Sequence, residues 1–147
     1  MNYTLRKALT DDLELSFEIR KNAMMKYIER SKGWDEEKEM QGHIEDFNTD
    51  VMQIIEARGK PIGVFESVVE CGNIYVHGLY ILDEFQNFKI GSRIIKDIIH
   101  KADTEKISIL LQVLKVNTQA KEFYVKHGFK ISEGNESYCK MIYKNVE

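Results

Sequence analysis

The chain has 147 residues, of which 43% are apolar and 31% charged, and its formal net charge is -3. These values are typical of one globular domain, and we expect a single domain over residues 1–147. A net negative charge without a long basic run excludes recognition of a phosphate backbone, so nucleic acid is not an expected partner.

The sequence also lacks the signals of export and membrane insertion. The N-terminal stretch MNYTLRKAL has no continuous apolar core, and no apolar run is long enough to cross a bilayer. We therefore expect a cytoplasmic protein without a membrane partner. Cys71 and Cys139 lie far apart and outside any Cys-x-x-Cys motif, which favours free thiols over a disulfide or a metal site.

The first half of the chain predicts one strand, two helices and three strands. Thr10, which is followed by two aspartates, is expected to cap the first helix. From residue 51 the apolar period changes to two, as in an antiparallel meander. The expected elements are a strand over Tyr3–Arg6, a helix after Thr10 with Leu13, Phe17, Met24 and Ile28 on its apolar stripe, a helix over Asp35–Phe47 with Met40, Ile44 and Phe47 on its apolar face, and strands over Val51–Ala57, Ile62–Glu70 and Asn73–Leu82.

The second half predicts alternating helices and strands. Apolar residues recur at helical spacing from Ile90 to Ala102, and Ile107–Val113 is an almost wholly apolar strand of the kind buried on both faces. Strand, helix and strand in this order predict a parallel βαβ crossover. Gly128 signals the end of the last helix. The remaining expected elements are a helix over Asn117–His127 and strands over Phe129–Ser132 and Tyr138–Tyr143.

The turn between Asn73–Leu82 and the helix that starts near Ile90 is a candidate anion site. A strand that leads into a helix through a polar turn directs free backbone N–H groups beyond the strand end. The positive end of the helix dipole and the side chains of Gln86, Asn87 and Ser92 would suit a diphosphate. From this stretch alone, a plain capped helix is the simpler interpretation.

A second candidate lies in the last predicted helix. Asn117, Ala120 and Tyr124 are spaced i, i+3 and i+7, which places them on one helical face. A phenol could then share a cleft with an amide and a methyl-sized gap. Without further context, Tyr124 and Phe123 are interpreted as core aromatics and Asn117 as an N-cap.

Both segments resemble motifs of the GNAT superfamily of acetyl-CoA-dependent N-acetyltransferases, and the order of elements fits that family over essentially the whole chain. Leu79–Ser92 resembles the (Gln/Arg)-x-x-Gly-x-(Gly/Ala) pyrophosphate loop, with Lys89 in place of the first Gly. Asn117–Phe129 is similar to the Asn-x-x-Ala-x-x-x-Tyr-x-x-x-Gly-Phe segment. The resemblance implies an α/β fold, namely a GNAT-like mixed, mostly antiparallel β-sheet with one parallel βαβ crossover, flanked by about four helices.

The resemblance also implies a reaction and its cofactor. An acetyl group would pass from acetyl-CoA to a primary amine of a small molecule or peptide by direct attack in a ternary complex. Backbone N–H groups around Leu79 and Ile81 would stabilise the thioester oxygen. The Lys89 side chain would either crowd the cofactor or place its ammonium beside the phosphates. The implied cofactor-binding residues are Leu79, Ile81, Gln86, Asn87, Phe88, Lys89, Ile90, Gly91, Ser92, Asn117, Ala120 and Tyr124.

Tyr124 and His77 are the implied catalytic residues. A phenol, with an unperturbed pKa of about 10, would act as general acid toward the leaving thiolate. His77 lies two residues before Leu79, where family members often carry a glutamate, and an imidazole with an unperturbed pKa of about 6.5 suits a general base. A half-buried, hydrogen-bonded histidine without a catalytic part is an equal alternative. Glu66 and Glu70 on the preceding strand are further candidates for the base.

Family analogy places the acceptor amine against the two N-terminal helices and their joint. A lone Trp beside Gly33 is more simply explained as a plug at the edge of the core. The same fold would also suit a catalytically weak or inactive acyl-CoA-binding sensor, or a partner-binding domain. We expect a monomer or homodimer without a metal. The candidate substrate residues are Met24, Tyr27, Trp34, Phe47 and Glu66.

Overall fold

The computed structural model describes residues 1–145 and contains two compact units. The first unit comprises Met1–Glu66 and Gly78–Ile90. The second comprises Ser67–His77 and the chain from Gly91 onward. The chain therefore passes from the first unit to the second, returns to the first, and enters the second again.

The strands form one sheet in the order β1-β2-β3-β4-β5-β7-β6. The described strand pairs are antiparallel except β4 (Asn73–Ile81) and β5 (Ser108–Leu114), which run parallel and are joined by helix α3 (Ile90–Glu105). The described residues contain four α-helices. The predicted fold class, a mixed and mostly antiparallel sheet with one βαβ crossover, is confirmed.

The first unit begins with strand β1 (Thr4–Lys7), the 3-10 turn η1 (Thr10–Asp12) and helix α1 (Leu13–Ser31). The predicted cap at Thr10 is wrong, because the 3-10 turn makes Asp12 the residue that precedes α1. The carboxylate of Asp12 accepts two hydrogen bonds from Arg6, at 2.8 and 3.1 Å, and one from the N–H of Leu9. The hydrogen bonds from Arg6 and Leu9 hold the pKa of Asp12 below its usual range, so this carboxylate anchors β1 to the start of α1.

Helix α2 (Glu36–Asp46) follows the joint that contains Trp34. The side chain of Asp35 caps this helix by accepting the N–H of Lys38 at 3.2 Å. The predicted apolar face is only partly correct, because α2 buries no residue and Ile44 is 47% exposed. Phe47, just beyond the helix, does pack against the core of this unit.

Strands β2 (Met52–Ala57) and β3 (Lys60–Glu70) form an antiparallel hairpin. Arg58 and Gly59 both have positive φ, 54° and 74°, as a two-residue type I′ turn requires. Strand β3 therefore starts two residues earlier than predicted. One buried cluster of the unit consists of Ala8, Ile19, Met52, Ile54 and Val64, and the partly buried side chains of Leu15, Phe47, Tyr80 and Leu82 pack against it.

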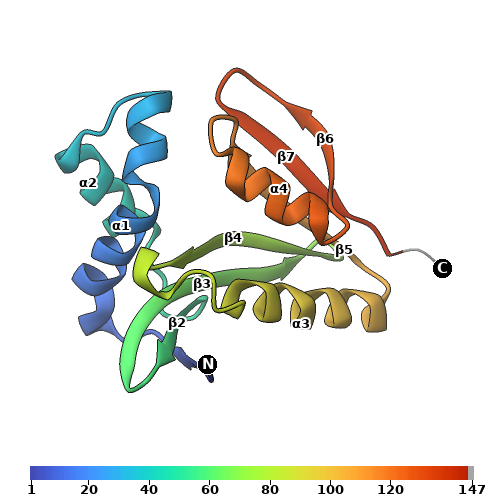
Figure 1. Ribbon diagram of the computed structural model, residues 1–147, viewed down its shortest axis with the longest axis horizontal. Helices are drawn as coiled ribbons and strands as arrows, with labels where there is room; N and C mark the ends of the chain where they lie inside the picture. Colours follow the sequence, from blue (N-terminus) through green and yellow to red (C-terminus); the bar gives the residue numbers. More distant parts are fainter. Residues whose placement is uncertain (146–147) are drawn as a thin grey trace. The chain divides into compact units, whose positions relative to one another are not determined.

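The second unit contains most of α3, strand β5, helix α4 (Thr118–Lys126) and the hairpin of β6 (Lys130–Gly134) and β7 (Tyr138–Tyr143) (Figure 1). Helix α4 ends at Lys126, and Gly128, the predicted C-terminal signal, follows two residues later with a φ of +94°. The prediction that β5 is buried on both faces is only partly correct. Its alternate residues Ile109, Leu111 and Val113 are buried, whereas Gln112 is exposed.

Both cysteines are free thiols, with Cys71 exposed and Cys139 buried. The helices within residues 1–145 are all too short or too polar to span a bilayer. Among residues 1–145, no three histidine, cysteine, aspartate or glutamate side chains lie close enough together to hold a metal ion.

Candidate active site

Strand β4 carries the predicted base and the two residues assigned to the thioester oxygen. The rings of Tyr75 and His77 stack, with 12° between their planes and 6.3 Å between their centroids, so these side chains share a strand face. His77 is exposed, which does not fit the alternative of a half-buried histidine. His77 belongs to the second unit, whereas Leu79 and Ile81 belong to the first.

The turn between β4 and α3 has a backbone suited to an anion. It contains a 3-10 turn, η2 (Asp83–Phe85), which was not predicted, and two left-handed residues that are not glycine, Asn87 with a φ of 70° and Lys89 with a φ of 63°. Left-handed residues within a turn bring successive N–H groups together, and such nests bind anions. The side-chain amide of Gln86 instead donates to the carbonyl oxygen of Ile81 at 2.9 Å, so it holds the turn together.

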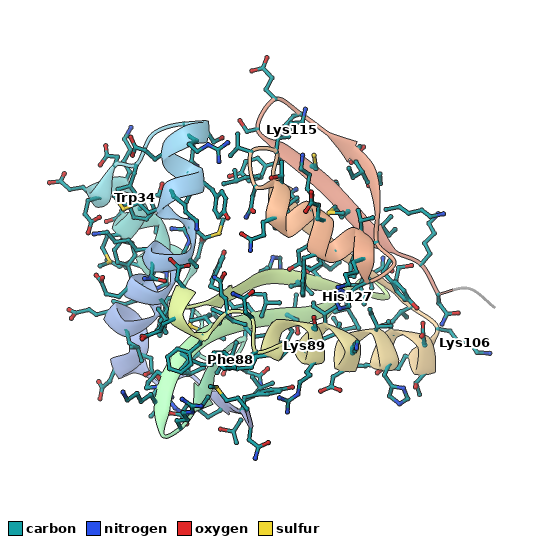
Figure 2. All side chains as sticks on the ribbon, viewed as in Figure 1. Trp34, Phe88, Lys89, Lys106, Lys115 and His127 are labelled. Atoms are coloured by element: carbon teal, nitrogen blue, oxygen red, sulfur yellow. The ribbon has the colours of Figure 1, made fainter. Side chains whose placement is uncertain are left out.

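Lys89 occupies the place of a glycine in both sequence pattern and backbone. Its φ lies in the region that glycine adopts without steric cost and that a Cβ atom makes unfavourable. The side chains of Phe88 and Lys89 are exposed just before α3 (Figure 2). The loop therefore has, at Lys89, a backbone conformation that favours glycine.

We expect Lys89→Gly to raise the free energy of unfolding by about 0.5–1 kcal/mol, because the relief of Cβ strain outweighs the added freedom of the unfolded chain. The control is Lys96→Gly in the exposed interior of α3, where the same change should cost about 1 kcal/mol. Chemical denaturation measures both. Equal destabilisation by the two variants would show that Lys89 carries no backbone strain.

Helix α4 presents the second predicted motif. Asn117 caps the helix, since its side-chain oxygen accepts the N–H of Ala120 at 3.0 Å, as predicted. The ring of Tyr124 is 8% exposed and lies edge-on to Phe123 and Phe129, at centroid distances of 5.1 and 5.3 Å. Tyr124 is thus a core aromatic that packs against two phenylalanine rings.

A polar cluster that was not predicted joins the two helices of the first unit. Arg20 of α1 donates to Glu39 of α2 at 2.9 Å, and its guanidinium carbon lies 6.0 Å from the centroid of the Trp34 ring. The cluster connects residues far apart in sequence, so neither periodicity nor spacing could have revealed it.

The candidate substrate residues all lie in the first unit. Met24 and Tyr27 are half-buried on α1, and Trp34 lies against Phe17 with 6.2 Å between ring centroids, as a plug at the edge of the core would. Glu66 is half-buried on β3. Burial raises the pKa of this carboxyl, and the negative charge of Asp46 adds to the effect, while Arg20 opposes it.

We expect Glu66→Gln to raise the melting temperature at neutral pH. A raised folded-state pKa means that Glu66 favours folding below its unfolded pKa and that this contribution is lost as the pH rises through the folded pKa. The gain in melting temperature from glutamine should therefore shrink as the pH is lowered from the folded-state pKa of Glu66 to its unfolded pKa. Glu70→Gln at the exposed end of the same strand is the control, and an equal gain there would contradict a specific effect of burial.

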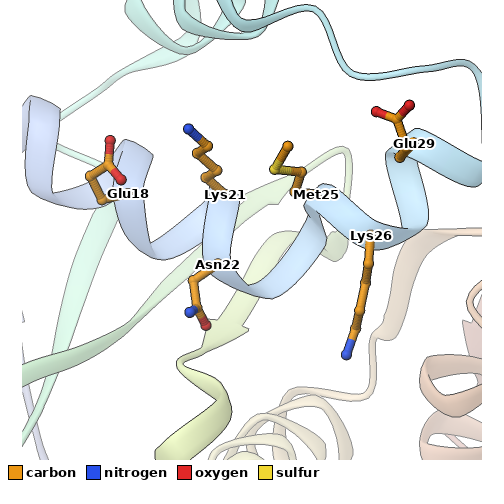
Figure 3. Close-up of a pocket in the computed structure, with 6 residues that line it drawn as sticks. All are labelled: Glu18, Lys21, Asn22, Met25, Lys26 and Glu29. Atoms are coloured by element: carbon orange, nitrogen blue, oxygen red, sulfur yellow. The ribbon is translucent and has the colours of Figure 1, made fainter.

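A groove of about 570 Å³ runs along one side of α1 and was also not predicted. Met25, which is 37% exposed, lies among charged and polar side chains in it (Figure 3). A methionine within a charged helical stretch is the only feature of the sequence that could have indicated this groove. The groove is lined by Glu18, Lys21, Asn22, Met25, Lys26 and Glu29.

The mixed sheet with its parallel crossover, the left-handed loop before α3 and the capped helix α4 together define an α/β acyltransferase domain. A sequence model of the acetyltransferase (GNAT) domain matches residues 21–142, which is most of the chain. The chain therefore belongs to the GNAT acetyltransferase family, as predicted. No curated protein matches this sequence.

Solved structures have the same fold at low sequence identity. The PaiA N-acetyltransferase from Thermoplasma acidophilum, in complex with coenzyme A, is 21% identical, with a TM-score of 0.77 over 98% of this chain and 99% of that one. A GNAT family acetyltransferase from Elizabethkingia anophelis with acetyl-CoA bound is 16% identical, with a TM-score of 0.69 over 97% of this chain and 98% of that one. Arabidopsis thaliana Naa50, in complex with the bisubstrate analogue CoA-Ac-MVNAL, is 14% identical, with a TM-score of 0.66 over 98% of this chain and 99% of that one. Acetyl-CoA, the predicted cofactor, is thus bound by a protein of this fold.

Proposed function

We propose that this protein is an N-acetyltransferase that transfers the acetyl group of acetyl-CoA to a primary amine by direct attack in a ternary complex. The observation that carries the proposal is the backbone of the loop before α3. Lys89 keeps a φ of 63°, so the loop retains the glycine-like conformation of a pyrophosphate loop even where the sequence departs from it.

The residues of this loop fit a diphosphate. Two left-handed residues precede the N-terminus of a 16-residue helix, so free N–H groups and the positive end of the helix dipole face the same anion. Asn87 to Ser92 would hold the pyrophosphate, and Asn117, Ala120 and Tyr124 would contact the remainder of the cofactor. When bound, acetyl-CoA supplies an acetyl thioester with a good leaving group.

The other steps belong to side chains and backbone of this chain. His77, which is exposed, would take the proton from the incoming ammonium and leave the amine nucleophilic. The N–H groups of Leu79 and Ile81 would donate to the carbonyl oxygen as negative charge develops there. Tyr124 would donate a proton to the departing sulfur, while the nitrogen of the new amide would lose its second proton to solvent. Tyr124 would then regain a proton from solvent and His77 would release its own, so that one proton in all is released for each ammonium that is acetylated.

Several further assignments accompany the proposal. A single acetyltransferase domain over residues 1–147 is supported by the family match, which includes residues of both compact units. A small molecule or a peptide is proposed as the acceptor, since the Naa50 structure holds a peptide-containing bisubstrate analogue. We also propose a cytoplasmic location and a monomeric or homodimeric state.

The second candidate function is an acyl-CoA-binding sensor, which the lysine in the glycine position favours. Both functions predict a rise in melting temperature with acetyl-CoA, because a ligand that binds only the folded state stabilises it. Only the enzyme predicts thiol release, read with a thiol reagent, when amines, polyamines, amino acids, aminoglycosides or peptides are added. No thermal shift at millimolar acetyl-CoA would exclude both, and a shift without thiol release would favour the sensor.

A further inference from the structure

The first half of β3 approaches the C-terminal end of β4 closely. Gly63 of β3 is buried, and a Cβ atom there would lie 2.5 Å from the carbonyl oxygen of Tyr80 and 2.9 Å from Cδ1 of Ile55. An ordinary contact of a Cβ atom is 3.4 Å or longer. Only glycine therefore allows β3 to lie this close to Ile55 of β2 on one side and to the backbone of Tyr80 on the other.

The contact at Tyr80 involves backbone, so a change of rotamer cannot relieve it. The carbonyl oxygen of Tyr80 moves only together with its planar peptide unit, and that unit also contains the N–H of Ile81. The described residues contain no cis peptide bond, and in a trans unit the C=O and N–H bonds point in opposite directions. Because the oxygen lies toward Gly63 of β3, the N–H of Ile81 points away from β3.

The N–H of Ile81 lies beyond the ladder that joins β4 to β5. In the described part of the chain that ladder pairs β4 from Asn73 to Val76, whereas β4 continues to Ile81. The parallel ladder therefore does not use this N–H, and an oxyanion donor must be left unused by the sheet in the same way. Position 63 thus bears directly on the peptide unit that carries one of the two proposed donors.

The next peptide unit along β4 is fixed by hydrogen bonds at both of its polar groups. The carbonyl oxygen of Ile81 accepts the side-chain amide of Gln86 at 2.9 Å. The N–H of Leu82 donates to the carbonyl oxygen of Ile62 at 2.9 Å. Since this unit is held, the orientation of the preceding one depends on the space that Gly63 leaves for the carbonyl group of Tyr80.

We propose that Gly63 is a positioning residue for acetyl transfer, which lets the peptide unit of Tyr80 and Ile81 lie where its N–H donates to the thioester oxygen. The inference rests on the proposed function. A methyl group at position 63 would have to lie roughly 0.9 Å further from the Tyr80 oxygen, and the two strands would share this displacement. A displacement of about 1 Å at a reacting centre can cost roughly 100-fold in rate, because donors must be oriented before the reaction.

The test compares Gly63→Ala with the double variant Ile55→Val/Gly63→Ala. Valine lacks the Cδ1 atom that the new Cβ atom would meet, so the double variant relieves the side-chain clash and leaves the backbone clash in place. Gly134→Ala is the matched control, because a Cβ atom at Gly134 of β6 would lie 2.7 Å from the carbonyl oxygen of Tyr138, in the second unit and without a proposed catalytic role.

Three properties are measured for each variant. They are the melting temperature, the NMR chemical shifts of the Tyr80 carbonyl carbon and the Ile81 amide without cofactor, and kcat and KM for acetyl-CoA with the amine that gives the fastest thiol release. The chemical shifts report on the peptide unit itself, independently of turnover. The double variant carries the test if Gly63→Ala alone does not fold.

We expect Gly63→Ala to change both chemical shifts and to lower kcat about tenfold, with KM for acetyl-CoA changed less than about twofold. The double variant should melt at a higher temperature than Gly63→Ala but have the same low kcat, because the Tyr80 oxygen is still displaced. Gly134→Ala should lower the melting temperature and leave the two chemical shifts and kcat unchanged.

A wild-type kcat in Gly63→Ala would overturn the inference, and so would unchanged chemical shifts at Tyr80 and Ile81. Recovery of kcat in the double variant would also contradict it, since the loss would then come from overpacking against Ile55. An equal loss of kcat in Gly134→Ala would assign the effect to stability alone. Failure of the proposed function has a different signature, in which the wild-type protein itself releases no thiol with any amine.

Discussion

Tyr124→Phe should lower kcat by about 100-fold while the affinity for acetyl-CoA changes by less than about twofold. A general acid contributes to the transition state and not to ground-state binding, so its loss reduces kcat without weakening the bound cofactor. The ring itself should stay in place, because Phe123 and Phe129 contact it edge-on and phenylalanine preserves that packing.

The measurements are steady-state thiol release and a thermal titration with acetyl-CoA. Tyr143→Phe is the control. It also removes a phenol hydroxyl group, which donates to Asp103 at 2.9 Å, and Tyr143 has no proposed catalytic role. If Tyr124→Phe turned over at the wild-type rate, Tyr124 would be a core aromatic only, which its 8% exposure already allows.

His77→Ala should remove the acid limb of the pH–rate profile and lower kcat at neutral pH by about 100-fold. A base must be unprotonated to accept the ammonium proton, so activity of the wild-type protein falls as the pH is lowered, and that fall disappears with the group that causes it. The exposed position of His77 allows the accepted proton to leave to solvent.

Glu66→Gln is the comparison that identifies the base. Glu66 is half-buried and its pKa is raised by burial, so it is the strongest competitor for the role among the candidates. We expect this variant to keep the acid limb. An acid limb that persists in His77→Ala and is lost in Glu66→Gln would move the role of base from β4 to β3.

Local signals in the sequence were sufficient for most of the fold. The pair Arg58-Gly59 and the residue Gly128 have the positive φ values that their turns require, and Asn117 caps α4 as its position indicated. The prediction that Thr10 caps the first helix was wrong, because a competing interaction determines where that helix begins. The carboxylate of Asp12 pairs with Arg6 of β1, which no local rule includes.

The candidate site also has parts that local signals in the sequence reveal and parts that they do not. The loop around Lys89 and the face of α4 are contiguous in sequence, so their motifs could be recognised directly. The contacts of Arg20 with Trp34 and Glu39 join residues 20, 34 and 39, and only the packed fold brings them together. The close approach of Gly63 to the backbone of Tyr80 is likewise a tertiary contact that composition does not reveal, since a Cβ atom at Gly63 would lie 2.5 Å from the carbonyl oxygen of Tyr80.

Transfer of the acetyl group to an amine nitrogen is the central claim, and carbonyl-labelled acetyl-CoA tests it most directly. The protein is incubated with the labelled cofactor and the amine that gives the fastest thiol release, and the product is followed by carbon NMR. The account predicts a labelled amide carbonyl in amounts equal to the thiol released, and none without protein. Thiol release with the label recovered only as free acetate, or no release with any amine although acetyl-CoA binds, would contradict it.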